Sequence, residues 1–157
     1  VPLLMIFGDI DAIVPYEENG AFAYEQAQAP KYLLTIAAGS HTAFAAEDTF
    51  FDRLQNPDTL GCSLLRRDGE EEDGEDSELA FEGLGGNDVG IIMGDCPSGC
   101  QSTTLPPAVV SSRQVELSQL AVVAFLEGYL RDDRQARHFL EEVLDVEHPE
   151  LTLRMKR

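Results

Sequence analysis

Two apolar runs separated by one helix-length segment constrain the fold of this chain more than any other feature. The first run, residues 3–7, ends at Gly8, and the second covers residues 31–37. The first is continuous, which is typical of a strand covered on both faces in a parallel sheet, and the second contains the β-favouring residues Tyr32, Thr35 and Ile36. Between them, Pro15 fixes a first helical turn, and the apolar spacing predicts an amphipathic helix that ends before Pro30. Strand, helix, strand is the parallel crossover unit, so the predicted fold class is α/β.

Polar residues follow both predicted strands. Asp9 and Asp11 come after the first, and Ser40 and His41 come after the second. An imidazole can take and return a proton near neutral pH, and a carboxylate beside it holds its tautomer. We therefore predict that His41 is a catalytic base, the alternative being a histidine that only caps the loop backbone.

Only one of the two aspartates can face His41. They are two residues apart, so an extended turn directs their side chains to different sides. We prefer Asp11, because it begins the segment that leads into the helix, and keep Asp9 as the alternative. Either acid could instead accept backbone N–H groups at the start of that helix. The other histidines, His138 and His148, are expected on the surface.

The motifs at these two strands resemble a known superfamily. VPLLMIFGDIDAIVP followed by KYLLTIAAGSHTAF resembles the acid and histidine strands of the α/β-hydrolases, particularly the dienelactone-hydrolase-like, cutinase-like and platelet-activating-factor-acetylhydrolase-like esterases. The resemblance implies the C-terminal portion of a doubly wound α/β-hydrolase sheet, with its last two parallel strands and packing helices. It assigns Asp11 and His41 to a Ser-His-Asp triad acting on a small-molecule or polymeric ester, and it implies no cofactor. The alternative is a noncatalytic structural or binding fragment of the same fold.

The G-x-S-x-G motif that carries the nucleophile in such enzymes is absent. The nearest string begins at Gly61, lacks the second glycine and follows the histidine, so we do not assign Ser63 as a nucleophile. The chain begins at Val1 inside a predicted strand, and we expect it to be the C-terminal part of a larger enzyme. Because the nucleophile and its oxyanion hole would be missing, we expect this chain alone to be inactive.

The charge balance excludes one class of function. The chain carries 29 acidic and 11 basic residues, a formal net charge of −18. Such a field repels nucleic acid, and the basic residues form no stripe that could neutralise phosphates. We therefore predict no nucleic-acid partner. No apolar run approaches the length of a membrane span, so none is predicted.

An acidic segment occupies the middle of the chain. Eight acids fall in residues 68–78, and acid and glycine dominate residues 66–90, which predicts a solvated loop. Calcium binding is the alternative, but the spacing does not match an EF-hand loop.

Three cysteines, Cys62, Cys96 and Cys100, lie in the same middle part. We expect a disulfide, either from Cys62 to one of the later cysteines or between Cys96 and Cys100. Zinc is the competing hypothesis, but no second pair or nearby histidine completes four ligands. A disulfide would indicate a secreted or periplasmic protein.

These observations divide one incomplete domain into three segments. Residues 1–54 carry the acid and the histidine, residues 55–110 form an acidic, cysteine-containing insertion, and residues 111–157 are C-terminal helices. The last segment is predicted to start with a capping box between Ser111 and Gln114. A kink or break is expected near residues 131–133. Substrate identity and oligomeric state are left open by the sequence.

Overall fold

A three-stranded mixed sheet forms the centre of the protein. The computed structural model describes residues 1–45, 49–69 and 99–157. The strands are β1 (Leu3–Gly8), β2 (Lys31–Ile36) and β3 (Leu151–Lys156), hydrogen-bonded in that order. β1 and β2 are parallel, whereas β2 and β3 are antiparallel. A helical segment lies between β1 and β2 in the chain, so the predicted strand, helix, strand arrangement at the N-terminus is present.

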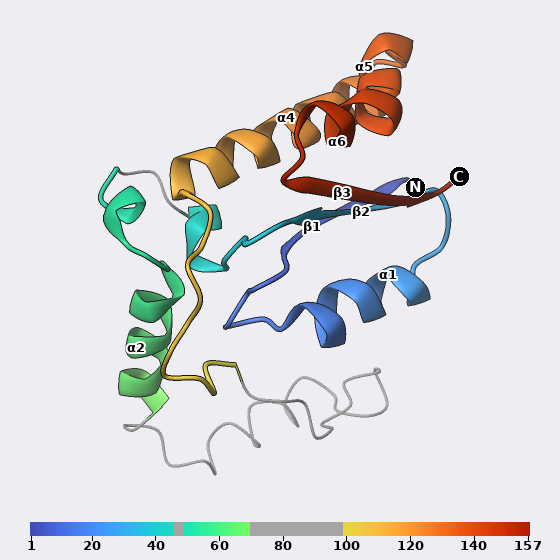
Figure 1. The fold of residues 1–157 in the computed structure, drawn as a ribbon. Helices are drawn as coiled ribbons and strands as arrows, with labels where there is room; N and C mark the ends of the chain where they lie inside the picture. The colour runs from blue at the N-terminus through green and yellow to red at the C-terminus, as the bar shows by residue number, and fades with distance from the viewer. Residues whose placement is uncertain (46–48, 70–98) are drawn as a thin grey trace.

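Helices lie on both faces of this sheet (Figure 1). A π-helical turn continues into α1 (Phe22–Gln26) on one face, and α4 (Ser111–Leu130) crosses the other. α2 (Asp58–Gly69) stands beyond the end of the sheet at which β1 and β2 finish. Among the described residues, no helix combines the length and apolarity that a membrane crossing requires.

The chain ends differently from the expectation that residues 111–157 are all helical. The expected break is confirmed, because α4 ends at Leu130 and α5 (Arg134–His138) starts after a cap by Asp133. A π-helical segment and α6 (Leu144–Glu147) then lead into the unpredicted strand β3. Apolar and polar residues alternate in LTLRMK, which is the pattern of a half-buried antiparallel strand. The prediction missed it because a strong helical pattern immediately precedes this short run.

The segment 55–110 is more than a loop insertion. α2 begins inside it, and its first residue, Asp58, is completely buried. Cys62 of α2 forms a disulfide with Cys100, which is one of the pairings expected from the sequence. The acidic run from residue 70 onward, the apolar residues 91–93 and Cys96 lie outside the described residues.

The core lies between the sheet and α4. Alternate residues of β2 face α4, which contributes Leu117, Ala121 and Ala124, while the C-terminal helices close the remaining side. Its buried members are Tyr32, Leu34, Ile36, Leu117, Ala121, Ala124, Leu140, Leu144 and Leu151.

One buried hydroxyl interrupts this apolar core. The Tyr32 side chain is fully buried, and its hydroxyl lies 2.5 Å from the Tyr129 hydroxyl and donates to Glu141 Oε1 at 2.5 Å. Burial is the main cause that raises the pKa of Tyr32 far above its ordinary value, and these two hydrogen bonds add to it. The tyrosine therefore keeps its proton in the folded state.

This raised pKa makes the stability of the protein pH-dependent in alkali. Because the folded state holds the Tyr32 proton more tightly, its contribution is fully present below the ordinary tyrosine pKa of about 10. Above that pH the free energy of unfolding should fall by up to about 1.4 kcal/mol per pH unit. Urea unfolding of the wild type and of Tyr32→Phe between about pH 9 and about pH 11 should give a steeper decline for the wild type. Parallel curves would contradict the assignment.

Candidate active site

Asp11 and His41 meet where the two parallel strands finish. The Asp11 Oδ2 atom lies 2.9 Å from the Nδ1 atom of His41. The carboxylate side chain is only 2% exposed, whereas the imidazole is 44% exposed. A buried carboxylate accepts the Nδ1–H proton, which leaves the lone pair of a neutral ring on Nε2. Within residues 1–45, 49–69 and 99–157, no side chain hydrogen-bonds to Nε2.

The second carboxylate oxygen of Asp11 binds the backbone of its own turn. Oδ1 accepts the N–H groups of Ile13 at 3.0 Å and Val14 at 2.7 Å. Asp11 therefore has both of the roles considered above: Oδ2 contacts the imidazole, and Oδ1 accepts backbone N–H groups. Asp9 is exposed on the same turn, and its backbone N–H bonds to Ile36. Asp11 is thus the aspartate that contacts the imidazole.

Two glycines allow close approach of the turn after β1, which carries Asp11 (the acid turn), and the turn after β2, which carries His41 (the histidine turn). Gly8 ends β1, and a Cβ atom built on it would lie 2.2 Å from the backbone oxygen of Gly39. The N–H of Ile10 also donates to that oxygen at 3.2 Å. Any side chain at Gly8 would separate the turns that carry Asp11 and His41.

A second carboxylate, that of Asp58, contacts the turns that carry Asp11 and His41. Its Oδ2 atom accepts the N–H groups of Ala12 and His41, both at 3.0 Å, and Oδ1 accepts that of Thr42 at 2.6 Å. The sequence analysis missed this residue because Asn56, Pro57 and Asp58 have the composition of an ordinary turn. An acid at a turn before a helix was the only local signal.

Gln114 holds the histidine turn from the opposite side. Its buried amide donates from Nε2 to the Ser40 carbonyl at 2.7 Å and accepts the Ser40 N–H on Oε1 at 3.0 Å. The predicted capping box is therefore wrong, because Gln114 pairs with Ser40 and, among the described residues, the Ser111 hydroxyl has no hydrogen-bond partner. Instead, Asp52 accepts the N–H of Ser112 at the start of α4.

Replacing Gln114 by alanine should destabilise the protein by about 2 to 3 kcal/mol, because it leaves both buried backbone groups of Ser40 unpaired. The matched control is Gln119→Ala on the exposed side of the same helix, for which we expect a change within about 0.5 kcal/mol. Urea unfolding of both variants measures the difference. Equal stabilities of the two variants would show that the Ser40 contacts contribute nothing.

The disulfide lies beside the acid turn. The N–H of Cys100 donates to the Ala12 carbonyl at 2.5 Å. A Cβ atom on the neighbouring Gly99 would lie 2.2 Å from the carbonyl oxygen of Ile13, so only glycine fits at this approach. The Cys62–Cys100 bond therefore connects α2 to a segment that packs directly on the turn carrying Asp11.

The remaining residues considered from the sequence lie elsewhere. Ser63 is exposed on α2, and its hydroxyl donates to the Leu60 carbonyl at 2.7 Å. His138 is exposed on α5, whereas His148 is half-buried with Nδ1 3.1 Å from Arg113 Nη2. None of the three contacts the Asp11–His41 pair.

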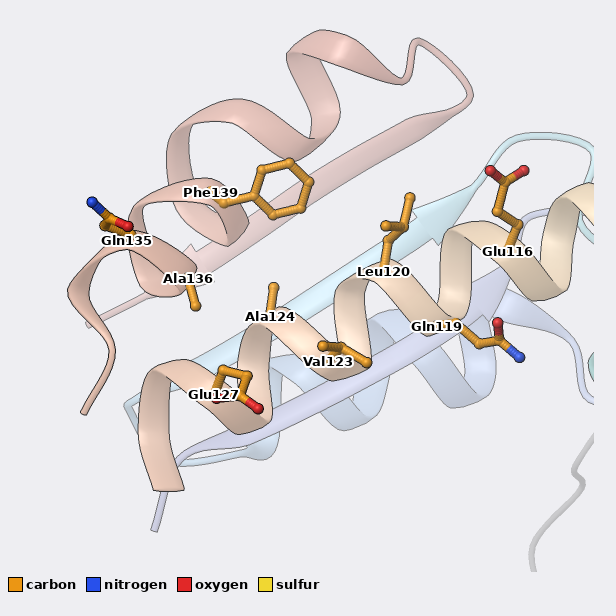
Figure 2. Close-up of a pocket in the computed structure, with 9 residues that line it drawn as sticks. All are labelled: Glu116, Gln119, Leu120, Val123, Ala124, Glu127, Gln135, Ala136 and Phe139. Atoms are coloured by element: carbon orange, nitrogen blue, oxygen red, sulfur yellow. The ribbon is translucent and has the colours of Figure 1, made fainter. Parts of the chain in front are cut away.

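Several hollows occur on the described surface, and His41 lines neither of the two described below. A groove of about 490 Å³ follows α4 and is closed by Ala136 and Phe139, with Leu120, Val123 and Ala124 along its floor (Figure 2). A second hollow, of about 400 Å³, lies beside the acid turn; among the residues that line it are Ile10, Asp11, Pro15, Cys100, Leu105 and Pro106. The groove shares no residue with the acid and histidine cluster.

No family model, curated protein or solved structure matches this chain. The functional assignment therefore depends on the geometry of the site.

Proposed function

We propose that this chain supplies the acid and the base of a Ser-His-Asp hydrolase, most simply a carboxylic-ester hydrolase of the α/β-hydrolase type. The observation that carries the proposal is the 2.9 Å contact between a buried Asp11 and a half-exposed His41. In the proposed reaction, Nε2 accepts the serine proton as the hydroxyl attacks the acyl carbon, then returns it to the leaving alcohol. Asp11 holds the ring and stabilises the imidazolium between these steps.

The unpaired outer edge of β1 supports the proposal that an additional strand carries the nucleophile. In the part of the chain that the structure describes, nothing pairs with this edge. β1 has the apolar run of a central strand, yet only Gly8 is buried, whereas every residue of β2 except Thr35 is buried. A parallel strand added there would cover β1 and would end at the same edge as Asp11 and His41. We propose that the segment preceding this chain provides it.

Two further features of the proposal follow from the chemistry. The acid and base need no cofactor for ester hydrolysis, so none is included. The Cys62–Cys100 disulfide supports a secreted or periplasmic location, where such bonds persist. The competing proposal is a noncatalytic fragment of the same fold, in which the Asp11–His41 pair only holds two turns together.

The test is made on the chain expressed together with the polypeptide encoded upstream of Val1. We expect hydrolysis of p-nitrophenyl butyrate and labelling of an upstream serine by a fluorophosphonate probe. His41→Ala should reduce kcat at least about 10³-fold, whereas the surface control His138→Ala should retain it. Activity that is unchanged in His41→Ala would show that this chain does not supply the catalytic base, which would favour the noncatalytic alternative.

A further inference from the structure

Asp58 joins the backbones of the two turns that carry the candidate catalytic pair. Ala12 belongs to the acid turn, whereas His41 and Thr42 belong to the histidine turn, and one carboxylate accepts an N–H from each of the three. The side chain is completely buried. Asp11 and His41 hydrogen-bond to each other through their side chains, so Asp58 is a separate connection between the backbones of the two turns, in addition to the Ile10–Gly39 hydrogen bond.

These contacts require a carboxylate. Oδ2 accepts two N–H groups and Oδ1 accepts one, so both oxygens of Asp58 act only as acceptors. A buried negative charge is costly unless donors surround it, and the three N–H groups provide that compensation. An asparagine at this position would place its NH₂ group against backbone N–H donors, whichever way the amide is turned.

The position of Asp58 is itself fixed by the segment that contains it. Its N–H donates to Asn56 Oδ1 at 2.9 Å, and Asn56 Nδ2 donates to the Pro106 carbonyl at 2.8 Å. One turn further along α2, Cys62 is bonded to Cys100, whose N–H returns to the Ala12 carbonyl. Asp58 is therefore held in place by Asn56, and its helix is connected to the acid turn through the disulfide.

We propose that Asp58 is the positioning residue of the acid–base pair: its carboxylate sets the distance and orientation of His41 relative to Asp11. This inference rests on the proposed function for its catalytic meaning, but its structural content can be tested without activity. Asp58 touches no reacting atom in this proposal and acts only through the two turns.

The test is the Nδ1–H proton of His41, observed by NMR in the chain as it exists. In the wild type this proton should give a slowly exchanging, downfield signal, because it is held by a buried carboxylate. Asp58→Asn should abolish or broaden the signal while the protein remains folded. The matched control is Asp133→Asn, which changes a carboxylate that also accepts two backbone N–H groups, at the start of α5, and should leave the signal intact.

The outcomes separate this inference from the proposed function. A His41 signal that survives in folded Asp58→Asn overturns the positioning role and leaves the Asp11–His41 pair intact. A wild-type protein without the signal overturns both. If Asp58→Asn does not fold, amide exchange in the wild type provides the test. The N–H groups of Ala12, His41 and Thr42 should then open together, with protection factors within about threefold of one another, and a difference above about 100-fold between the two turns would overturn the proposal.

Discussion

Gly8→Ala is expected to destabilise the protein by about 4 kcal/mol or more and to separate the candidate catalytic pair. The added Cβ atom would lie 2.2 Å from the Gly39 oxygen and 2.3 Å from the Gly39 carbonyl carbon. Both atoms belong to the backbone, so no side-chain rotation relieves the clash. The two turns must therefore move apart by roughly 1 Å to reach an ordinary contact distance, and overpacking of this kind belongs to the most damaging substitutions.

Gly128→Ala provides the contrast for this prediction. Gly128 is buried in α4, but a Cβ atom there would lie 3.3 Å from its nearest neighbours, which belong to Arg137. The gain of about 1 kcal/mol in helix propensity offsets a contact of this size, so we expect a net change within about 1 kcal/mol. Urea unfolding measures both variants, and the His41 Nδ1–H signal should disappear only in Gly8→Ala. A Gly8→Ala protein as stable as the wild type would show that the turns are not in close contact.

Asp11→Asn is expected to invert the tautomer of His41. In the proposed hydrolase, which includes the upstream polypeptide, it should reduce kcat roughly 10⁴-fold, as the equivalent change does in serine-protease triads. The amide oxygen should occupy the position of Oδ1, because two backbone N–H groups point at it. The NH₂ group then faces Nδ1 of His41 and donates to it. Nδ1 must therefore carry the lone pair, and Nε2, which should accept the serine proton, is already protonated.

Asp9→Asn is the matched control, because it makes the same chemical change two residues away on an exposed side chain. Nitrogen-15 NMR of the chain alone should show Nδ1 protonated in the wild type and in Asp9→Asn, and Nε2 protonated in Asp11→Asn. In the proposed enzyme, kcat should be retained in Asp9→Asn and reduced in Asp11→Asn. An unchanged tautomer in Asp11→Asn would contradict the assignment of the acid, and loss of activity in Asp9→Asn alone would transfer the role to Asp9.

The local features of the fold were predictable because they depend on short segments. Apolar and β-favouring residues indicated β1 and β2, and Pro15 and Pro30 bounded the intervening helix. His41 was noticeable because it lies in the turn that follows a strand. The alternation in β3 was also visible, but the run has only six residues and follows a long helical pattern, so it was not recognised as a strand.

Contacts between distant segments were decided by the tertiary structure. Asp58 lies 46 residues from Ala12, and Gln114 lies 74 residues from Ser40, so no periodicity or spacing relates either pair. In both cases a local motif suggested a local role, a turn for Asp58 and a helix cap for Gln114. Asp58 and Gln114 instead pair with buried backbone groups of the two turns that carry Asp11 and His41, because such groups are costly to leave unpaired. The amino-acid pattern was enough to place an acid and a histidine after two successive strands. Which acid meets the histidine, and which buried side chains hold the two turns, depended on the folded chain, because the hydrogen-bond partners at that edge come from segments far away in the sequence.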